Sequence, residues 1–119
     1  MVVGYYPHWE QGFVRDYLMG LENRVDRRKA AAKLRFDIQM LATEWPRPKF
    51  VRVKKLRGYE SLWELMREYE GISYRVFFCV SDDEMWLLHA IEKKSQKTPL
   101  SDLELAFKRM HDIFRRKDE

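Results

Sequence analysis

The sequence predicts an α+β domain in which helices near both ends of the chain pack against an antiparallel sheet formed by its middle. Three observations support this prediction. Apolar residues recur at helical spacing between residues 13 and 45, and again between residues 100 and 114. Between these stretches, segments rich in aromatic and branched residues alternate with turn signals, as strands do. The length of 119 residues fits one domain, so we expect residues 1–119 to fold as a single unit.

The N-terminal part is expected to contain one strand and two helices. The strand is VVGYY, which Pro7 follows, and the first helix lies in FVRDYLMGL. A longer helix runs from about residue 25 to residue 45, and Pro46 ends it. The apolar residues of this helix fall on one stripe, which consists of Ala30, Leu34, Ile38, Leu41 and Trp45. The simplest arrangement of the two helices is a hairpin.

After Pro48 the pattern changes to that of strands. Strand-like segments lie at 54–56, 62–69, 74–80 and 85–91, with turn signals near Gly71 and at 81–83, which predicts an antiparallel meander. A last helix is expected to begin at Thr98, an N-cap residue followed by proline, with Ser101 and Glu104 as an alternative capping box. The stripe that packs this helix onto the sheet would be Leu100, Leu103, Phe107, Met110 and Phe114.

Positive charge is concentrated in two parts of a chain whose net charge is +4. The segment 45–58 has no acidic residue and contains Arg47, Lys49, Arg52, Lys54, Lys55 and Arg57. The second concentration is Lys93, Lys94 and Lys97, where the last predicted strand ends and a helix begins. These lysines form either a solvated turn or an anion site that the positive end of the helix reinforces.

The composition disfavours several classes of protein. The single cysteine, Cys79, cannot form an internal disulfide, and its apolar surroundings favour a packing role. No apolar run has the length of a membrane span or a signal peptide, so a cytoplasmic protein is expected. The histidines lack the spacing of metal ligands, and no glycine-rich nucleotide loop or serine-nucleophile motif is found. We therefore expect no metal and no cofactor.

Two residues in the predicted strands are candidates for chemistry, each with a structural alternative. In the strand YRVFFCV, alternation places on one face Arg75, Phe77 and Cys79. Arg75 either grips a phosphate or pairs with Glu64 or Glu68 across the sheet. His89, in LLHAI, is either a partly buried histidine bonded to the backbone or a group that transfers protons.

Five blocks in the second half of the chain carry a family resemblance. In order, they are Lys-Lys-Leu at 54–56, Leu-Trp-Glu-Leu at 62–65, Tyr-Arg-Val-Phe at 74–77, Leu-Leu-His at 87–89, and Lys-Lys-Ser-Gln-Lys-Thr-Pro at 93–99. In this order the blocks resemble the phage-derived HigB-like branch of the RelE/ParE toxin superfamily. The resemblance covers about half of the chain, and the helical N-terminal part agrees with it in layout.

The resemblance implies a RelE-like fold: a mostly antiparallel four-stranded sheet with two N-terminal helices and a C-terminal helix, its first strand coming from the N-terminus. It also implies the toxin of a type II toxin–antitoxin pair, an endoribonuclease that cuts mRNA in the ribosomal A site without a metal. The implied partners are mRNA, ribosomal RNA and a helix-turn-helix, HigA-like antitoxin that masks the basic groove. No membrane is implied.

Such an enzyme lets the 2′-hydroxyl of RNA attack the neighbouring phosphate. The reaction needs a proton acceptor, a proton donor and cations that stabilise the phosphorane. The resemblance implies Arg75 and Lys94 as phosphate clamps and His89 as the candidate for proton transfer. The residues implied to contact RNA and the ribosome are Lys54, Lys55, Arg57, Arg67, Lys93, Gln96 and Lys97.

The chain departs from the family pattern at three places. Met66 stands where the family carries an arginine, and Arg67 follows on the nominally opposite face of the strand unless a bulge restores it. Ser95 replaces the usual threonine, and Leu100 lies near the place of a tyrosine that RelE itself carries. Two other functions therefore stay open: a ParE-like inhibitor that binds DNA gyrase, and a decayed toxin that keeps only antitoxin or nucleic-acid binding.

Overall fold

The computed structural model of the chain describes residues 1–93 and 97–118, and its architecture is α+β, as the sequence predicts. The helices and strands fall close to the segments expected from periodicity. In chain order they are β1 (Val2–Tyr5), α1 (Phe13–Glu22), α2 (Arg28–Glu44), β2 (Arg52–Lys55), β3 (Trp63–Tyr69), β4 (Ile72–Ser81), β5 (Glu84–Lys93) and α3 (Leu100–Lys117).

The sheet has five strands and is mixed, so the expected four-stranded, mostly antiparallel sheet is wrong. Its order is β1-β5-β4-β3-β2. The meander from β2 to β5 is antiparallel, whereas β1 runs parallel to β5, from Val2 opposite Glu84 to Tyr5 opposite Leu87. Without β1, the edge of β5 would present a row of unpaired backbone groups. The direction of β1 depends on the path of the helices that follow it, which a local pattern does not contain.

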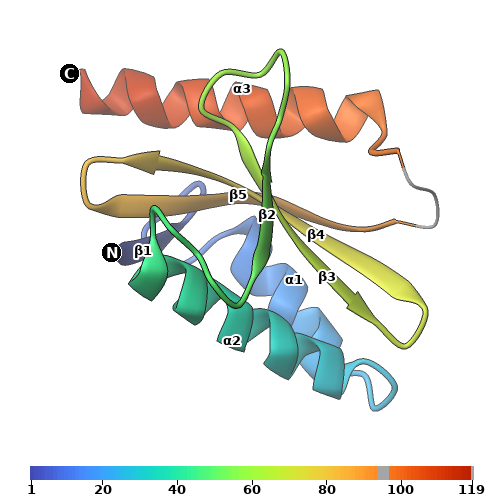
Figure 1. Cartoon of the computed structure of the whole chain (residues 1–119). Helices are drawn as coiled ribbons and strands as arrows, with labels where there is room; N and C mark the ends of the chain where they lie inside the picture. Colours follow the sequence, from blue (N-terminus) through green and yellow to red (C-terminus); the bar gives the residue numbers. More distant parts are fainter. Residues whose placement is uncertain (94–96, 119) are drawn as a thin grey trace.

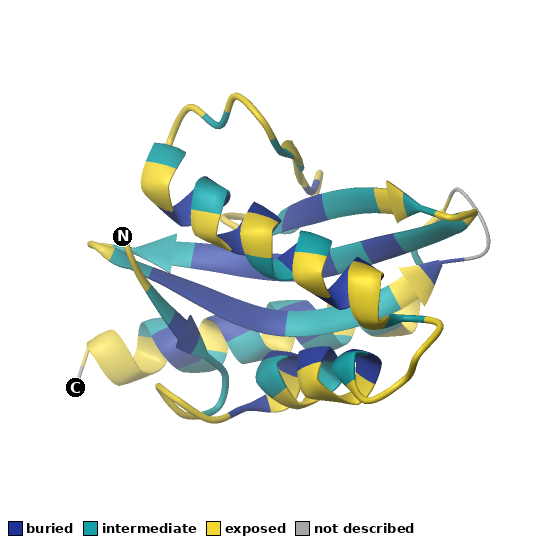
Figure 2. Ribbon diagram, turned by 90° about the horizontal axis from the view of Figure 1, so that it is seen from below, coloured by how far each residue is buried: buried dark blue, intermediate teal, exposed yellow. Residues whose placement is uncertain are grey.

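Helices cover both faces of the sheet (Figure 1). α1 and α2 pack on one face, around a core to which Leu34 and Tyr74 belong. α3 packs on the other face, around a core that includes Phe77 and Met110. In Figure 2, which is coloured by burial, each helix carries buried residues interspersed with exposed ones, as expected for helices that have one face against the sheet. The sheet is therefore covered on both sides, and its two faces carry different side chains.

The alternation expected for β4 is confirmed. Tyr74, Val76 and Phe78 belong to the core under α1 and α2, whereas Phe77 and Cys79 belong to the core under α3. Cys79 is fully buried, and this burial raises the pKa of its thiol to about 12. A thiol in this setting stays protonated at neutral pH, so Cys79 has the packing role that the sequence indicates.

A bulge in β5 changes which side chains face α3. Leu87 and His89 lie opposite consecutive residues of β4, so Leu88 between them is an extra residue. Strict alternation after Leu88 would turn His89 towards α1 and α2. Instead, His89 lies opposite Phe77 and shares its face, and alternation then carries Lys93 to the same side.

The start of α3 differs from the expected one. The helix begins at Leu100, with Pro99 at the N-cap position and no side chain in a capping hydrogen bond. The backbone N–H groups of Asp102 and Leu103 donate to the Pro99 oxygen. Leu100, expected on the packing stripe, is 62% exposed. Thr98 does not cap the helix, and its hydroxyl takes part in a side-chain network described below.

Candidate functional site

A cavity of about 400 Å³ lies between the strands β2 to β5 and the start of α3. This first cavity has five positively charged side chains and one carboxylate among its described lining residues. The lining residues are Lys54, Arg57, Arg75, Lys93 and Lys97, the carboxylate Glu64, and Leu56, Tyr59, Thr98 and Leu103. The excess of positive charge in a concave space suits an anionic ligand.

Strand pairing brings these charges together. Lys54 of β2 lies opposite Glu64 of β3, and Arg75 of β4 lies opposite Met66, the next residue of β3 on that face. Lys93 of β5 reaches the same face after the bulge. Each of the four antiparallel strands thus contributes one charged side chain, held by the sheet at a defined position.

Arg75 lines the cavity and is also held by its neighbours. Its Nη1 donates to Glu64 Oε1 at 3.2 Å and its Nε to Ser73 Oγ at 2.9 Å, and its Nη2 lies 3.7 Å from Glu68 Oε1. The expected ion pairing across the sheet is therefore confirmed, and phosphate binding by the same residue stays a prediction. The two interpretations are compatible, because a guanidinium has five N–H donors in a fixed fork.

Lys93 is buried in the wall of the cavity. Its Nζ donates to Thr98 Oγ1 at 3.0 Å, and this hydroxyl donates in turn to Glu64 Oε1 at 3.4 Å. Burial lowers the pKa of Lys93, and so do the positive charges of Arg75 and Lys54, against a smaller opposing effect of nearby carboxylates. An anion in the cavity would relieve the repulsion among these cations.

His89 shares the α3 face of the sheet, but it is not among the lining residues of the first cavity. Its Nε2 lies 2.7 Å from Asp102 Oδ1, in the first turn of α3. Its ring stacks on Phe77, with the ring centroids 5.9 Å apart. The partner of this histidine is thus a carboxylate rather than the backbone, and its part in proton transfer stays a prediction.

Two of the residues expected to contact RNA lie on the opposite face of the sheet. The ammonium group of Lys55 lies over the Trp63 ring, 5.9 Å from its centroid. Arg67 forms a two-pronged ion pair with the buried Asp37 of α2, with Nε 2.6 Å from Oδ2. Pairing of β3 with β4 is regular through Met66 and beyond, so no bulge turns Arg67 back to the cavity. The structure therefore separates Lys55 and Arg67 from the other candidates.

Three residues of the expected lysine turn, Lys94, Ser95 and Gln96, lie outside the described residues, whereas Lys97 and Arg57 line the cavity. Two polar members of the site were not among the site residues predicted from the sequence. Glu64 was expected only as a partner of Arg75, and Thr98 as a helix cap within the block at 93–99. Alternation in the strand 62–69 places Glu64 and Glu68 on one face, so a carboxylate near Arg75 could be expected, but the register between the strands is needed to choose Glu64. Nothing local marks Thr98.

The described lining residues can bind an anion by charge and by hydrogen bonds. In residues 1–93 and 97–118, no group of three or more histidine, cysteine, aspartate or glutamate side chains is placed to hold a metal ion. Within the same ranges, no helix combines the length and the apolar character needed to cross a membrane.

The comparison with protein families matches residues 17–111 to phage-derived Gp49-like proteins (DUF891). No curated protein and no solved structure matches the chain. The matched region includes both N-terminal helices from Tyr17 onward, the strands β2 to β5 and the part of α3 up to His111, and so every described residue that lines the first cavity. The chain therefore belongs to the family of phage-derived Gp49-like proteins, a family associated with toxin–antitoxin systems.

Proposed function

We propose that the protein is the toxin of a type II toxin–antitoxin pair, of the HigB-like kind, and that it is a ribosome-dependent endoribonuclease. Its substrate is mRNA in the ribosomal A site, its partner is a helix-turn-helix antitoxin, and its place of action is the cytoplasm. One observation carries the proposal: the first cavity gathers five positive side chains around a single carboxylate. This charge suits the phosphate backbone of RNA. The toxin–antitoxin association of the family supports the biological role.

In the proposed reaction, the 2′-oxygen of one nucleotide bonds to the neighbouring phosphorus while the bond from phosphorus to the 5′-oxygen breaks. The 2′-hydroxyl gives up a proton, the leaving 5′-oxygen gains one, and the products are a 2′,3′-cyclic phosphate and a 5′-hydroxyl. Arg75 and Lys93 stabilise the negative charge of the phosphorane. Lys54, Arg57 and Lys97 hold the flanking phosphates.

Proton transfer is assigned to His89. The carboxylate of Asp102, 2.7 Å from its Nε2, orients the ring and fixes which nitrogen carries the proton. Lys94 remains the second phosphate clamp of the proposal, on the strength of the sequence alone. We expect His89→Gln to slow cleavage more than it weakens RNA binding, because it removes proton transfer and keeps the positive cavity.

Primer extension on a translated message tests the enzymatic function. Purified wild-type protein is compared with Arg75→Lys and Lys93→Met, with and without ribosomes. Arg75→Lys keeps a positive charge beside the buried Glu64 but loses the fork that can bind two oxygens of a phosphate. Lys29→Ala, at an exposed position of α2 away from the cavity, is the matched control.

We expect new 5′ ends with wild-type protein and with the control, only when ribosomes are present. Cleavage by Arg75→Lys and Lys93→Met should fall at least roughly ten-fold, which corresponds to losing about one charge-assisted hydrogen bond. A message that stays whole while ribosomes translate it in the presence of wild-type protein would refute the enzymatic function. Growth arrest without new mRNA ends would then favour a protein target.

A further inference from the structure

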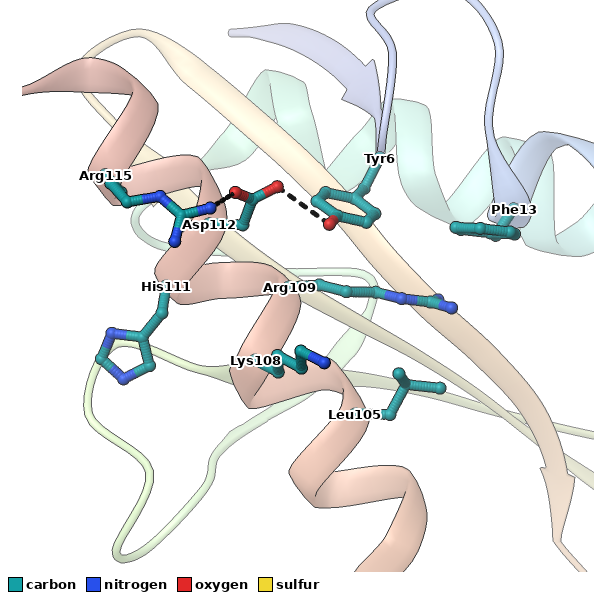
Figure 3. Close-up of a pocket in the computed structure, with 8 residues that line it drawn as sticks. All are labelled: Tyr6, Phe13, Leu105, Lys108, Arg109, His111, Asp112 and Arg115. Atoms are coloured by element: carbon teal, nitrogen blue, oxygen red, sulfur yellow. Dashed lines mark hydrogen bonds and ion pairs between the residues drawn. The ribbon is translucent and has the colours of Figure 1, made fainter. Parts of the chain in front are cut away.

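A second cavity, of about 620 Å³, lies where the loop after β1 and the start of α1 approach α3 (Figure 3). Its wall includes two aromatic rings, three positive side chains and one carboxylate: Tyr6, Phe13, Lys108, Arg109, Arg115 and Asp112. The described lining residues of the first and second cavities do not overlap. The second cavity is therefore a separate place on the molecule, on the other flank of α3.

Arg109 is a positive charge held among aromatic rings. Its guanidinium carbon lies 4.1 Å from the centroid of the Phe13 ring and 5.6 Å from that of Tyr6, and its Nη1 donates to the backbone oxygen of Leu88 at 2.8 Å. Figure 3 shows the side chain extending from α3 towards the Phe13 ring. Burial lowers the pKa of Arg109, and no carboxylate in the described part of the chain forms an ion pair with it. Arg109 is therefore a half-buried cation with which no carboxylate of residues 1–93 and 97–118 pairs.

Asp112, the carboxylate of this wall, is already neutralised. It accepts a hydrogen bond from the Tyr6 hydroxyl at 2.9 Å and pairs with Arg115 and, at 2.8 Å, with Arg116. The hydrogen bond from Tyr6 and the two arginines lower the pKa of Asp112. Lys108 lies exposed at the rim and adds a further positive charge. The cavity therefore has positive charge in excess of what its own carboxylate compensates.

We propose that the second cavity binds a nucleotide of single-stranded RNA, with the base on the exposed part of the Phe13 ring and the adjoining phosphate on Arg109 and Lys108. Phe13 is 48% exposed, and an exposed ring beside cations is the usual platform for unpaired bases. This inference rests on the proposed function, because RNA is named as the ligand on the ground that the proposed substrate is mRNA. A strand held in the first cavity would be held a second time across α3.

A nucleotide fits these groups better than an acidic peptide does. A carboxylate side chain would neutralise Arg109 and Lys108 but leave the Phe13 ring unused, whereas a nucleotide engages the ring and the charges together. The last ten residues of α3, from 108 to 117, agree with a polyanionic ligand, because Asp112 is their one carboxylate among five positive residues. These are Lys108, Arg109, Arg115, Arg116 and Lys117.

The test is fluorescence anisotropy with a labelled 2′-O-methyl RNA strand of about eight nucleotides, a length near the site size of single-strand binders. The methyl groups block the attacking hydroxyl, so the strand stays intact whether or not the protein is an enzyme. Phe13→Leu removes the aromatic ring and keeps an apolar side chain, and Lys108→Glu reverses an exposed charge. Lys29→Glu makes the same charge change on the exposed surface of α2.

We expect Phe13→Leu and Lys108→Glu each to weaken binding roughly ten-fold, and Lys29→Glu to change it by less than about two-fold. Equal effects of Lys108→Glu and Lys29→Glu, or unchanged affinity in both cavity variants, would overturn the inference. Tighter binding of a poly-glutamate peptide than of the RNA would also overturn it, in favour of an acidic protein partner. If the variants lose RNA binding but wild-type protein cuts no translated message, the RNA site stands and the endonuclease fails.

Discussion

Lys93 shows how far the setting of a single residue can differ from its sequence context. It begins a run of lysines that suggests a solvated turn, yet its side chain is only 7% exposed. The Thr98 hydroxyl accepts a hydrogen bond from Lys93 and donates one to Glu64, which also holds Arg75. One hydroxyl thus connects a lysine and an arginine through a shared carboxylate. A change in the charge of Lys93 would therefore affect the positions of Thr98, Glu64 and Arg75 in the first cavity.

The lowered pKa of Lys93 predicts that anion binding depends on pH. A phosphate favours the charged ammonium group, so affinity should fall as pH rises through the lowered pKa of Lys93, earlier than it would for an ordinary lysine. Titration calorimetry with the 2′-O-methyl RNA, between about pH 7 and pH 10, measures this fall. Lys93→Met should bind more weakly at neutral pH and lose the early part of the fall. A pH profile of this variant that coincides with that of the wild type would contradict the role of Lys93.

Among the helices, α1 offers a paired test of packing, because it carries one crowded and one open glycine. A Cβ added to Gly12, at the N-cap, would overlap the Tyr6 backbone oxygen and lie 2.6 Å from that of Tyr5. A Cβ added to Gly20, within the same helix, would have nothing within 4 Å. The crowded position fixes how the loop after β1 approaches the start of α1. The same substitution should therefore have opposite effects at the two positions.

We expect Gly12→Ala to lower the free energy of unfolding by at least about 2 kcal/mol, because backbone atoms must move to admit the methyl group. Gly20→Ala should raise it by about 0.5–1 kcal/mol, because alanine loses less conformational entropy on entering a helix. Urea unfolding of both variants measures the two changes. Two shifts of the same sign would show that the loop and the helix are not packed as described.

The strands show which features of an element a local pattern can reveal. The alternation of β4 could be predicted, because successive side chains of a strand point to opposite faces of the sheet, and YRVFFCV has the composition of a strand. The bulge at Leu88 could not, because LLHAI is apolar on both sides and allows either register. The orientation of His89 and Lys93 depends on that one extra residue. One charged residue of the first cavity, Lys93, and the candidate for proton transfer, His89, therefore owe their orientation to a feature that only the folded sheet reveals.

For the molecule as a whole, the two faces of the sheet place two paired arginines in different surroundings. Arg67 and Arg75 lie on neighbouring strands, and each pairs with a buried carboxylate, Asp37 and Glu64 respectively. The ion pair of Arg67 with Asp37 connects β3 to α2, whereas the ion pair of Arg75 with Glu64 lies in the wall of the first cavity. Substitution of Arg67 should therefore act on folding, and substitution of Arg75 on ligand binding.

Arg67→Met tests this division. It leaves Asp37 buried without a partner, so we expect the free energy of unfolding to drop by about 2–4 kcal/mol. The double variant Arg67→Met with Asp37→Leu should recover most of that loss, because no buried charge remains. Denaturant unfolding of the single and double variants measures both values. The RNA affinity of Arg67→Met is measured under conditions in which the variant is folded. A fall in affinity there would mean that Arg67 also has a ligand-binding role.

How much of the molecule the sequence predicts depends on whether a feature is local or long-range. Helical and strand periodicity are local, and they located the elements from α1 to α3. The parallel pairing of β1, the place of Thr98 and the partner of Arg67 join segments far apart in the chain, and no pattern of spacing contains them. The concentration of positive charge could be seen in the sequence. The sequence did not reveal which of these positive residues line the same cavity.

The parallel pairing of β1 with β5 has a consequence for the order of folding. β1 lies at Val2–Tyr5, but its partner residues begin at Glu84, so this strand pair cannot form until β5 has been synthesised. Bringing such distant segments together costs chain entropy, which makes this contact a late one. β5 also carries Lys93 into the first cavity. A nascent chain therefore has the basic residues of β2 well before β5 supplies the wall of the first cavity.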